Sequence, residues 1–346
     1  MTTTSVLAVP SPGAAFDKST IELRTPRSDD VLIDIAYCGI CHTDIHFAHE
    51  EWGAATFPMV PGHEIAGVVA AVGSAVTTHR VGDRVGVGCM VGSCGACEYC
   101  LAGREQYCAK GFTPTYGAVG YDGEPTYGGY ARQIVVRDRF VVPIPDGIGL
   151  DVAAPLLCAG ITTYSPLRRW HAGAGTKVAV VGLGGLGHLA VKQAAAMGAE
   201  VTVLSQSLRK RADGLRLGAH DYFATADEST FDTLAGRFDL IVNTVSATVA
   251  LDPYLSLLAP EGVLANVGVG SEPSSFGSFS LIGGNKMLAG SAFGGIEETR
   301  EMLEFCAANG IGADIEVVAG DEVDTAFERV RRGDVRYRFV IDTTTL

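Results

Sequence analysis

Short apolar runs separated by glycine and proline dominate the first part of the chain. The runs at 31–40, 64–73 and 83–88 read VLIDIAYCGI, EIAGVVAAVG and DRVGVG. β-Branched residues fit pleated strands, while glycine and proline mark the turns between strands. The pattern therefore predicts an all-β, barrel-like domain over residues 5–145.

Beyond residue 158 the apolar runs alternate with segments of helical character. Strands are predicted at KVAVVG, VTVL, FDLIVNTV and GVLANVGVG, and a helix over 187–197 follows the first of them. This alternation is typical of βαβ units and of a parallel, doubly wound sheet. Four glycines between 182 and 187, followed by His188 and Lys192, argue against a membrane span at 178–199.

The C-terminal part is predicted to form a helix over 297–311 and a strand over 336–343. We expect this tail to return to the first domain. The predicted domains are thus a catalytic domain formed by 1–157 and 294–346, and a nucleotide-binding domain formed by 158–293.

The composition supports two globular domains. Of the 346 residues, 47% are hydrophobic and 19% are charged, so the chain can bury a sizeable core. The formal net charge of -13 argues against nucleic acid or an anionic membrane as the main partner. The opening MTTTSVLAVP lacks the features of a secretory signal, so we expect a cytoplasmic protein.

Nine cysteines are many for a cytosolic chain, where clustered thiols more often bind metal than form disulfides. Four of them have the spacing C-x2-C-x2-C-x7-C in a polar, glycine-containing loop: Cys94, Cys97, Cys100 and Cys108. Four thiolates close a tetrahedron around one zinc ion and leave no open position, so this site is predicted to be structural. Unrelated surface thiols and an iron–sulfur cluster are the alternatives.

A second metal site is indicated by three distant motifs. CGICHTDIH from 38, PGHEIAG from 61 and PLLCAG from 155 can together supply two thiolates and one imidazole. Three protein ligands leave the fourth position open, as in catalytic zinc sites. Taken singly, His63 is as readily an ordinary buried histidine, and Cys158 a small core residue. The prediction depends on their occurring together.

The strand that ends at Val181 leads into a glycine motif, G-x-G-x-x-G, which opens the following helix. Its residues are Gly182, Leu183, Gly184, Gly185, Leu186 and Gly187. Glycine permits the tight turn and the close approach of a pyrophosphate to the helix N-terminus. With a strand before it and a helix after it, the motif predicts a dinucleotide site.

The end of the second strand indicates which dinucleotide is bound. NAD-dependent enzymes place a carboxylate there, whereas this chain has Ser205, within the segment SQSLRKR at 205–211. Hydroxyls and cations suit a 2′-phosphate, so we expect NADP(H). The alternative is that Arg209, Lys210 and Arg211 are only the solvated start of the next helix.

Further motifs complete a recognisable set: TYGGYA from 126, LLCAGITTYSPL from 156, GLGGLGHLAVK from 182 and DVRYRFVID from 334. With them, the chain resembles the cinnamyl alcohol dehydrogenase branch of the zinc-containing medium-chain alcohol dehydrogenases over nearly its whole length. The resemblance implies a GroES-like catalytic domain interrupted by a Rossmann nucleotide-binding domain. It also implies a homodimer.

The resemblance makes Cys41, His63 and Cys158 the ligands of a catalytic zinc ion, so that about two zinc ions are expected per chain. Glu64 would lie close behind this metal. Asp44 would orient one of its ligands.

The resemblance also assigns a proton relay and the cofactor contacts. Thr43 would supply a proton to the alkoxide, His46 would exchange it with solvent, and His42 would lie near the pyrophosphate. A hydroxyl bonded only to backbone and a surface histidine are the alternatives for the first two. The other implied cofactor-binding residues are Thr162, Ser205, Ser207, Arg209, Lys210, Thr244, Val267, Ser291 and Phe293.

The predicted function is zinc-dependent hydride transfer between NADP(H) and a primary alcohol or aldehyde. The expected substrate is a small molecule, either aromatic, such as a cinnamyl or benzyl compound, or medium aliphatic. Trp52 would add apolar bulk near it. A reductase of C=C or C=N bonds on the same scaffold, and a non-catalytic protein that binds zinc and NADPH, are the alternatives.

Overall fold

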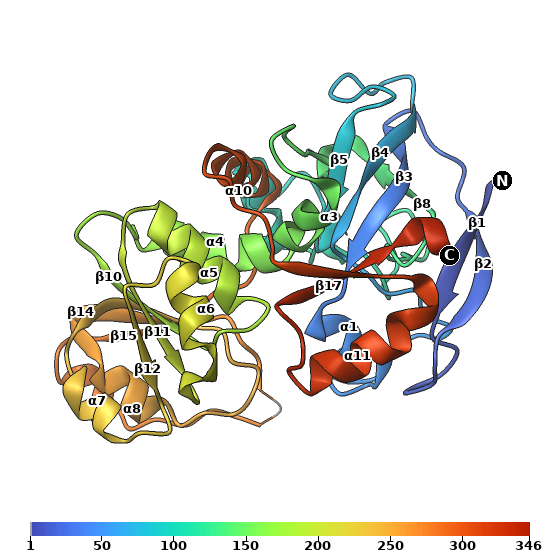
Figure 1. Ribbon diagram of the computed structural model, residues 1–346. Helices are drawn as coiled ribbons and strands as arrows, with labels where there is room; N and C mark the ends of the chain where they lie inside the picture. Colours follow the sequence, from blue (N-terminus) through green and yellow to red (C-terminus); the bar gives the residue numbers. More distant parts are fainter. Residues whose placement is uncertain (1, 271) are drawn as a thin grey trace. The chain divides into compact units, whose positions relative to one another are not determined.

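The computed structural model describes residues 2–270 and 272–346. The chain divides into two compact units, one formed by residues up to Cys158 together with Gly294–Leu346, and the other by Ala159–Phe293 (Figure 1). Each unit is described by itself. No helix among the described residues is both long and apolar enough to cross a membrane.

The first unit is built on a largely antiparallel sheet. Among the described residues its strand order is β16-β17-β3-β4-β5-β9, and β8 pairs antiparallel with the first half of β3, residues 30–34. The strands are β3 (Asp30–Gly39), β4 (Ile65–Val72), β5 (Arg84–Val87), β8 (Gln133–Arg137), β9 (Val142–Pro143), β16 (Ile315–Val318) and β17 (Arg338–Asp342). Two small sheets pair β1 (Thr2–Ala8) with β2 (Asp17–Leu23), and β6 (Met90–Gly92) with β7 (Thr113–Pro114).

The C-terminal segment completes this sheet, because β17 pairs antiparallel with the end of β3, in the register Ile341 to Cys38. The helices of the segment are α10 (Ile296–Ala308) and α11 (Val323–Arg331). Helix α11 buries Val323, Phe327 and Val330, which are spaced for one helical face.

The all-β prediction for this unit was incomplete, because the chain turns helical directly after β3. Helix α1 spans His42–Ala48 and lies beside α11 (Figure 1). Its first turn is capped by Asp44, whose carboxylate accepts the backbone N–H of Cys41 at 2.8 Å. Such a cap is a local signal that the strand-like apolar pattern obscured. Two further short helices are α2 (Glu98–Leu101) and α3 (Leu150–Ala153).

The second unit confirms the predicted parallel, doubly wound sheet. Among the described residues its strand order is β12-β11-β10-β13-β14-β15, with every pair parallel. The strands are β10 (Lys177–Val181), β11 (Glu200–Ser205), β12 (Asp221–Ala224), β13 (Phe238–Asn243), β14 (Leu258–Asn266) and β15 (Met287–Gly290). The helices are α4 (Ala159–Arg169), α5 (Gly187–Ala196), α6 (Arg211–Arg216), α7 (Ser229–Thr233), α8 (Leu251–Ser256) and α9 (Phe279–Ile282).

The turn between β10 and α5 explains the spacing of the glycine motif. Gly182 has φ +90°, a left-handed conformation that glycine adopts without strain. A Cβ on Gly187 would lie 1.9 Å from the carbonyl oxygen of Gly182, so the helix and the strand approach too closely for any side chain. A Cβ on Gly184 would meet no atom within 4 Å. Gly184 therefore borders open space, whereas Gly187 allows the helix to pack directly against the end of the strand.

This difference predicts that two alanine variants differ in their free energy of unfolding. Gly187→Ala should lower the free energy of unfolding by about 1–3 kcal/mol, because helix and strand must separate. Gly184→Ala should leave it within about 1 kcal/mol of the unmodified protein, since nothing is displaced. Chemical denaturation followed by circular dichroism measures both. Equal stability of the two variants would contradict this packing.

Candidate functional site

The four clustered cysteines of the first unit lie around one point. Their sulfurs are all within 4.8 Å of one another. Cys97 precedes α2, Cys100 lies within α2, and Cys108 follows a 3-10 turn at Glu105–Tyr107. Cys100 Sγ lies 3.5 Å from Cys97 Sγ and 3.9 Å from Cys94 Sγ.

The backbone of this loop favours the thiolate form of two of its cysteines, Cys97 and Cys108, whereas burial raises the pKa of Cys100 to about 11. The N–H groups of Cys94, Cys97 and Ala109 donate to cluster sulfurs at 3.3, 3.4 and 3.5 Å. The Ala109 N–H lowers the pKa of Cys97. Although desolvation opposes it, the Cys94 N–H lowers the pKa of Cys108 to about 6. Tetrahedral zinc with about 2.3 Å bonds requires sulfurs about 3.8 Å apart, so this set fits a zinc ion.

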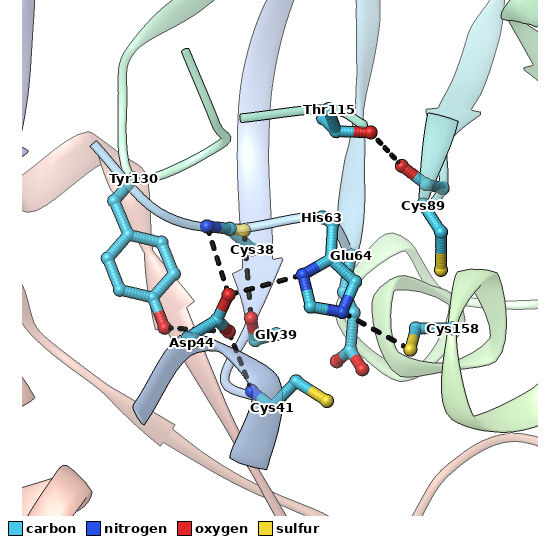
Figure 2. Close-up of polar contacts among 12 residues, drawn as sticks. Cys38, Gly39, Cys41, Asp44, His63, Glu64, Cys89, Thr115, Tyr130 and Cys158 are labelled. Carbon is cyan, nitrogen blue, oxygen red and sulfur yellow. Dashed lines mark hydrogen bonds and ion pairs between the residues drawn. The ribbon is translucent and has the colours of Figure 1, made fainter. Parts of the chain in front are cut away.

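A second cluster joins three distant parts of the same unit. Cys41 caps the start of α1, His63 and Glu64 directly precede β4, and Cys158 follows a 3-10 turn at Ala154–Leu157. One ligand atom from each of the four lies within 4.8 Å of the others. Figure 2 shows the two sulfurs, the imidazole and the carboxylate turned toward a common space. His63 Nε2 is 3.2 Å from Cys158 Sγ, which suits two ligands of one small cation.

Asp44 is completely buried and positions two residues of this cluster, Cys41 and His63, through hydrogen bonds. Its carboxylate accepts from His63 Nδ1 at 3.1 Å and from the Gly62 N–H at 3.2 Å. The Tyr130 hydroxyl donates to it at 3.3 Å (Figure 2). With Nδ1 engaged in this way, Nε2 of His63 presents its lone pair to the cluster.

Glu64 is paired with a residue that the sequence interpretation had not assigned. Its Oε1 accepts from Arg338 of β17, and both side chains are almost fully buried. Among the described residues, its Oε2 is a buried atom with no hydrogen-bond partner. An orphaned carboxylate oxygen beside two cysteines and a histidine fits a cation at this point. An arginine within the apolar strand RYRFVID was the available signal for its partner.

Close contacts and burial shift the pKa values of the cluster, and only that of Cys41 moves toward the deprotonated form that ligates zinc. The contact between the two thiols lowers the pKa of Cys41 well below its ordinary value and raises that of Cys158. Burial alone would lower the pKa of His63, but the Asp44 carboxylate raises it. Burial raises the pKa of Glu64 to about 7, in spite of Arg338. Divalent zinc would neutralise the negative charge gathered here.

The predicted relay residues lie on α1. Thr43 is half-buried and His42 is exposed. The imidazole of His46 stacks on Trp52, with ring centroids 4.3 Å apart, and its Nδ1 bonds to the Glu51 carboxylate. The sequence interpretation did not assign Glu51, because only the fold of the turn after α1 brings it to His46.

In the second unit, all of the predicted cofactor residues except Thr162 lie at or after the carboxyl ends of the parallel strands, where doubly wound folds bind ligands. Ser205 ends β11, and Lys210 Nζ donates to the carbonyl of Leu183 in the glycine turn at 2.8 Å. Thr244 follows β13, and its hydroxyl donates to the Val181 carbonyl at 2.8 Å. The others lie as follows: Gly182–Gly187 after β10, Ser207 and Arg209 after β11, Val267 after β14, Ser291 and Phe293 after β15, and Thr162 on α4.

Comparison with known proteins identifies the family. Residues 27–146 match the alcohol dehydrogenase GroES-like domain, and 185–308 match the zinc-binding dehydrogenase family. A probable formaldehyde dehydrogenase of Bacillus subtilis is 61% identical over 99% of this chain and 98% of its own length. The chain belongs to the zinc-containing medium-chain alcohol dehydrogenases.

Two other proteins place this alcohol dehydrogenase within its family. NADP-dependent alcohol dehydrogenase C 1 of Mycolicibacterium smegmatis is 56% identical and covers 100% of this chain and 99% of its own. A cinnamyl alcohol dehydrogenase structure from Sorghum bicolor superposes with a TM-score of 0.96 at 43% identity, over 99% of this chain and 98% of the other. The predicted family, fold class and enzyme class are confirmed: the protein is a zinc alcohol dehydrogenase, an oxidoreductase of small alcohols and aldehydes.

The two clusters predict the metal content of the dehydrogenase. Purified protein should contain about two zinc ions per chain, and Cys158→Ala should lose about one of them. Cys97→Ala should lose the other and unfold more readily, because structural zinc contributes folding energy. Elemental analysis with denaturation curves measures both effects.

Cys306→Ala is the matched control, since this buried thiol lies in α10 and belongs to neither cluster. It should retain the zinc of the unmodified protein. A fully active dehydrogenase with a single zinc ion would contradict the assignment of two sites.

Proposed function

We propose that the dehydrogenase transfers hydride between NADP(H) and an aromatic or medium aliphatic alcohol or aldehyde, with Cys41, His63 and Cys158 holding the catalytic zinc ion. The proposal rests on the cluster of these two thiols and one imidazole, with the Glu64 carboxylate within 4.8 Å of them. This set leaves a coordination position for substrate, whereas the four-cysteine set does not.

When bound, zinc polarises the carbonyl oxygen of the substrate and the nicotinamide supplies the hydride. The protein's own residues prepare this reaction. Asp44 keeps His63 in the tautomer that ligates through Nε2, and Arg338 compensates the negative charge of Glu64 in an ion pair. Thr43 provides the hydroxyl that gives a proton to the product oxygen or takes it away, and His46 exchanges that proton with solvent.

The preference for NADP(H) rests on the end of β11. Ser205 stands where a carboxylate would repel a 2′-phosphate, and Ser207, Arg209 and Lys210 follow with hydroxyls and cations. The similarity to the NADP-dependent alcohol dehydrogenase C 1 of Mycolicibacterium smegmatis supports the same cofactor.

The substrate class is supported by aromatic side chains beside the open cluster. Tyr116 lies 5.8 Å from His63, ring centroid to ring centroid, and Phe47 lies 5.9 Å from Tyr116. Trp52 contacts Phe47 edge to face at 5.8 Å. Flat apolar substrates gain contacts from such side chains. The similarity to the cinnamyl alcohol dehydrogenase structure from Sorghum bicolor supports this class.

We further propose a cytoplasmic homodimer with the predicted domains, 1–157 with 294–346 and 158–293. Strand β15 is an edge of its sheet, and its Met287 is exposed, as are Phe279 and Ile282 of α9, which precedes it along the chain. Exposed apolar side chains of this kind are what an interface would require. None of the nine cysteines forms a disulfide, which suits a reducing compartment.

The coenzyme and the substrate are tested together by initial rates. Benzaldehyde, cinnamaldehyde and hexanal should be reduced with a kcat/KM for NADPH at least about 100-fold above that for NADH, because only NADPH offers a 2′-phosphate for charge-assisted hydrogen bonds with these hydroxyls and cations. Ser205→Asp should lower this ratio at least about tenfold, since the new carboxylate repels the 2′-phosphate.

Ser205→Ala is the matched control, because it removes the hydroxyl without adding charge. It should change the ratio far less than the aspartate does. Equal use of both coenzymes by the unmodified enzyme would overturn the cofactor proposal, and no turnover of any aldehyde would overturn the function.

A further inference from the structure

The loop that carries the four cysteines also contacts the start of a helix far along the chain. Glu105 lies in this loop, between Cys100 and Cys108, and is buried. Its Oε2 accepts the backbone N–H of Ile296 at 3.2 Å, although 191 positions separate the two residues. Ile296 is the first residue of α10, so the carboxylate satisfies one of the N–H groups that a helix N-terminus leaves without a partner.

A close backbone contact lies beside this hydrogen bond. A Cβ on Gly295, the N-cap residue of α10, would lie 2.0 Å from the carbonyl oxygen of Gly103 and 3.0 Å from Glu105 Oε2. No side chain larger than that of glycine fits there without a shift of the backbone. Residues 103–105 of the loop and 295–296 of the helix thus form one tight contact, which we call the loop–helix junction.

Short-range contacts within the cysteine loop fix the backbone of Glu105. The backbone N–H of Cys108 donates to the Glu105 carbonyl at 3.0 Å, and that of Arg104 donates to the Tyr99 carbonyl at 2.9 Å. These bonds belong to the end of α2, which carries Cys100, and to the 3-10 turn that precedes Cys108. A metal ion bound by the four sulfurs would hold this backbone, and with it the carboxylate, in place.

The helix side of the junction lies next to the point at which the chain returns to the first unit. This return falls between Phe293 and Gly294, directly ahead of the junction. On the other side of the return, the backbone N–H of Ser291 donates at 3.1 Å to the carbonyl of Asn266, the last residue of β14. The short segment 291–296 is therefore fastened at both of its ends.

Two residues of this segment, Ser291 and Phe293, are among the proposed coenzyme contacts. Because the segment is short, the junction restricts the positions that these two residues can take. We infer that Glu105 is a positioning residue for the coenzyme: it holds the start of α10 and so keeps Ser291 and Phe293 in the arrangement that binds NADP(H). The cysteine loop takes no part in hydride transfer, yet it acts on coenzyme binding through this carboxylate. The inference rests on the proposed coenzyme contacts.

The competing explanation is that Glu105 only stabilises the helix. A carboxylate at a helix N-terminus adds to stability through its hydrogen bond and the helix dipole. Its loss would then lower the melting temperature and leave the affinity of the folded protein for NADPH unchanged. A positioning role requires this affinity to fall as well, so coenzyme binding to folded protein separates the two roles.

Two variants weaken the junction from opposite sides. Glu105→Leu removes the acceptor, so that the Ile296 N–H loses its partner. Gly295→Ala places a methyl group against the Gly103 carbonyl and displaces the helix start. Glu105→Gln is the conservative variant, because its amide oxygen still accepts the hydrogen bond, and it should bind NADPH as the unmodified protein does.

Glu98→Leu is the matched control. Glu98 is an exposed residue of α2 in the same cysteine loop, and its side chain forms no hydrogen bond or ion pair with any residue that the structure describes. The control makes the same chemical change as Glu105→Leu without altering the junction. It should therefore retain the NADPH affinity and the zinc content of the unmodified protein.

The experiment titrates each full-length, zinc-loaded variant with NADPH by isothermal titration calorimetry. Glu105→Leu and Gly295→Ala should each raise the dissociation constant about tenfold, which lies within what the loss of one hydrogen bond to a charged group allows. The double variant should bind no more weakly than either single variant, because both changes break the same junction. Hydrogen exchange of the backbone N–H groups at 291–296 should be faster in both single variants and unchanged in Glu105→Gln.

Each other outcome is decisive. An unchanged dissociation constant in Glu105→Leu beside a lower melting temperature would show a purely stabilising role, and Gly295→Ala decides the same question if Glu105→Leu does not fold. An equal loss of affinity in Glu98→Leu would show an effect that does not pass through the junction. NADPH binding that is indifferent to Glu105 would refute this inference alone, whereas failure of the unmodified protein to bind NADPH would refute the proposed function.

Discussion

The open metal site depends on the buried carboxylate of Asp44. It accepts the backbone N–H of Cys41, which starts α1, and the backbone N–H of Gly62, which precedes His63. It also accepts from His63 Nδ1 and from Tyr130. One anion thus sets the position of two ligand-bearing segments and the tautomer of one ligand. The carboxylate can be buried because it accepts hydrogen bonds from four donors. A hydrophobic side chain at this position would leave all four donors without an acceptor.

Much of this arrangement was predictable from the sequence, for a physical reason. Metal ligands and phosphate-binding glycines obey strict local spacing, as in Cys94 to Cys108 and in Gly182 to Gly187. The four predicted strands of the second unit were confirmed as β10, β11, β13 and β14, because their apolar runs are bounded by clear turn residues. Strand β14 ends at Asn266, so the predicted strand residues 267–270 were wrong, and β12 and β15 were not predicted. The roles assigned to individual site residues remain predictions.

What escaped prediction depends on tertiary contacts. Glu64 and Arg338 are 274 positions apart, and only the pairing of β17 with β3 brings the arginine to the cluster. Helix α1 was not predicted, because the motif CGICHTDIH was interpreted only as a source of metal ligands and relay residues. Its Asp44 also caps the start of the helix. Glu51 reaches His46 through a turn whose backbone conformation no apolar pattern indicates.

Hydride transfer from NADPH to a carbonyl carbon under the control of the open zinc site can be followed with NADPH deuterated at the transferring face of C4 and benzaldehyde as substrate, with the product analysed by mass spectrometry. The native enzyme should give benzyl alcohol with a single deuterium at C1, and the Cys158→Ala variant should give none. Unlabelled alcohol from the native enzyme, or labelled alcohol formed equally fast by the variant, would exclude this role of the site.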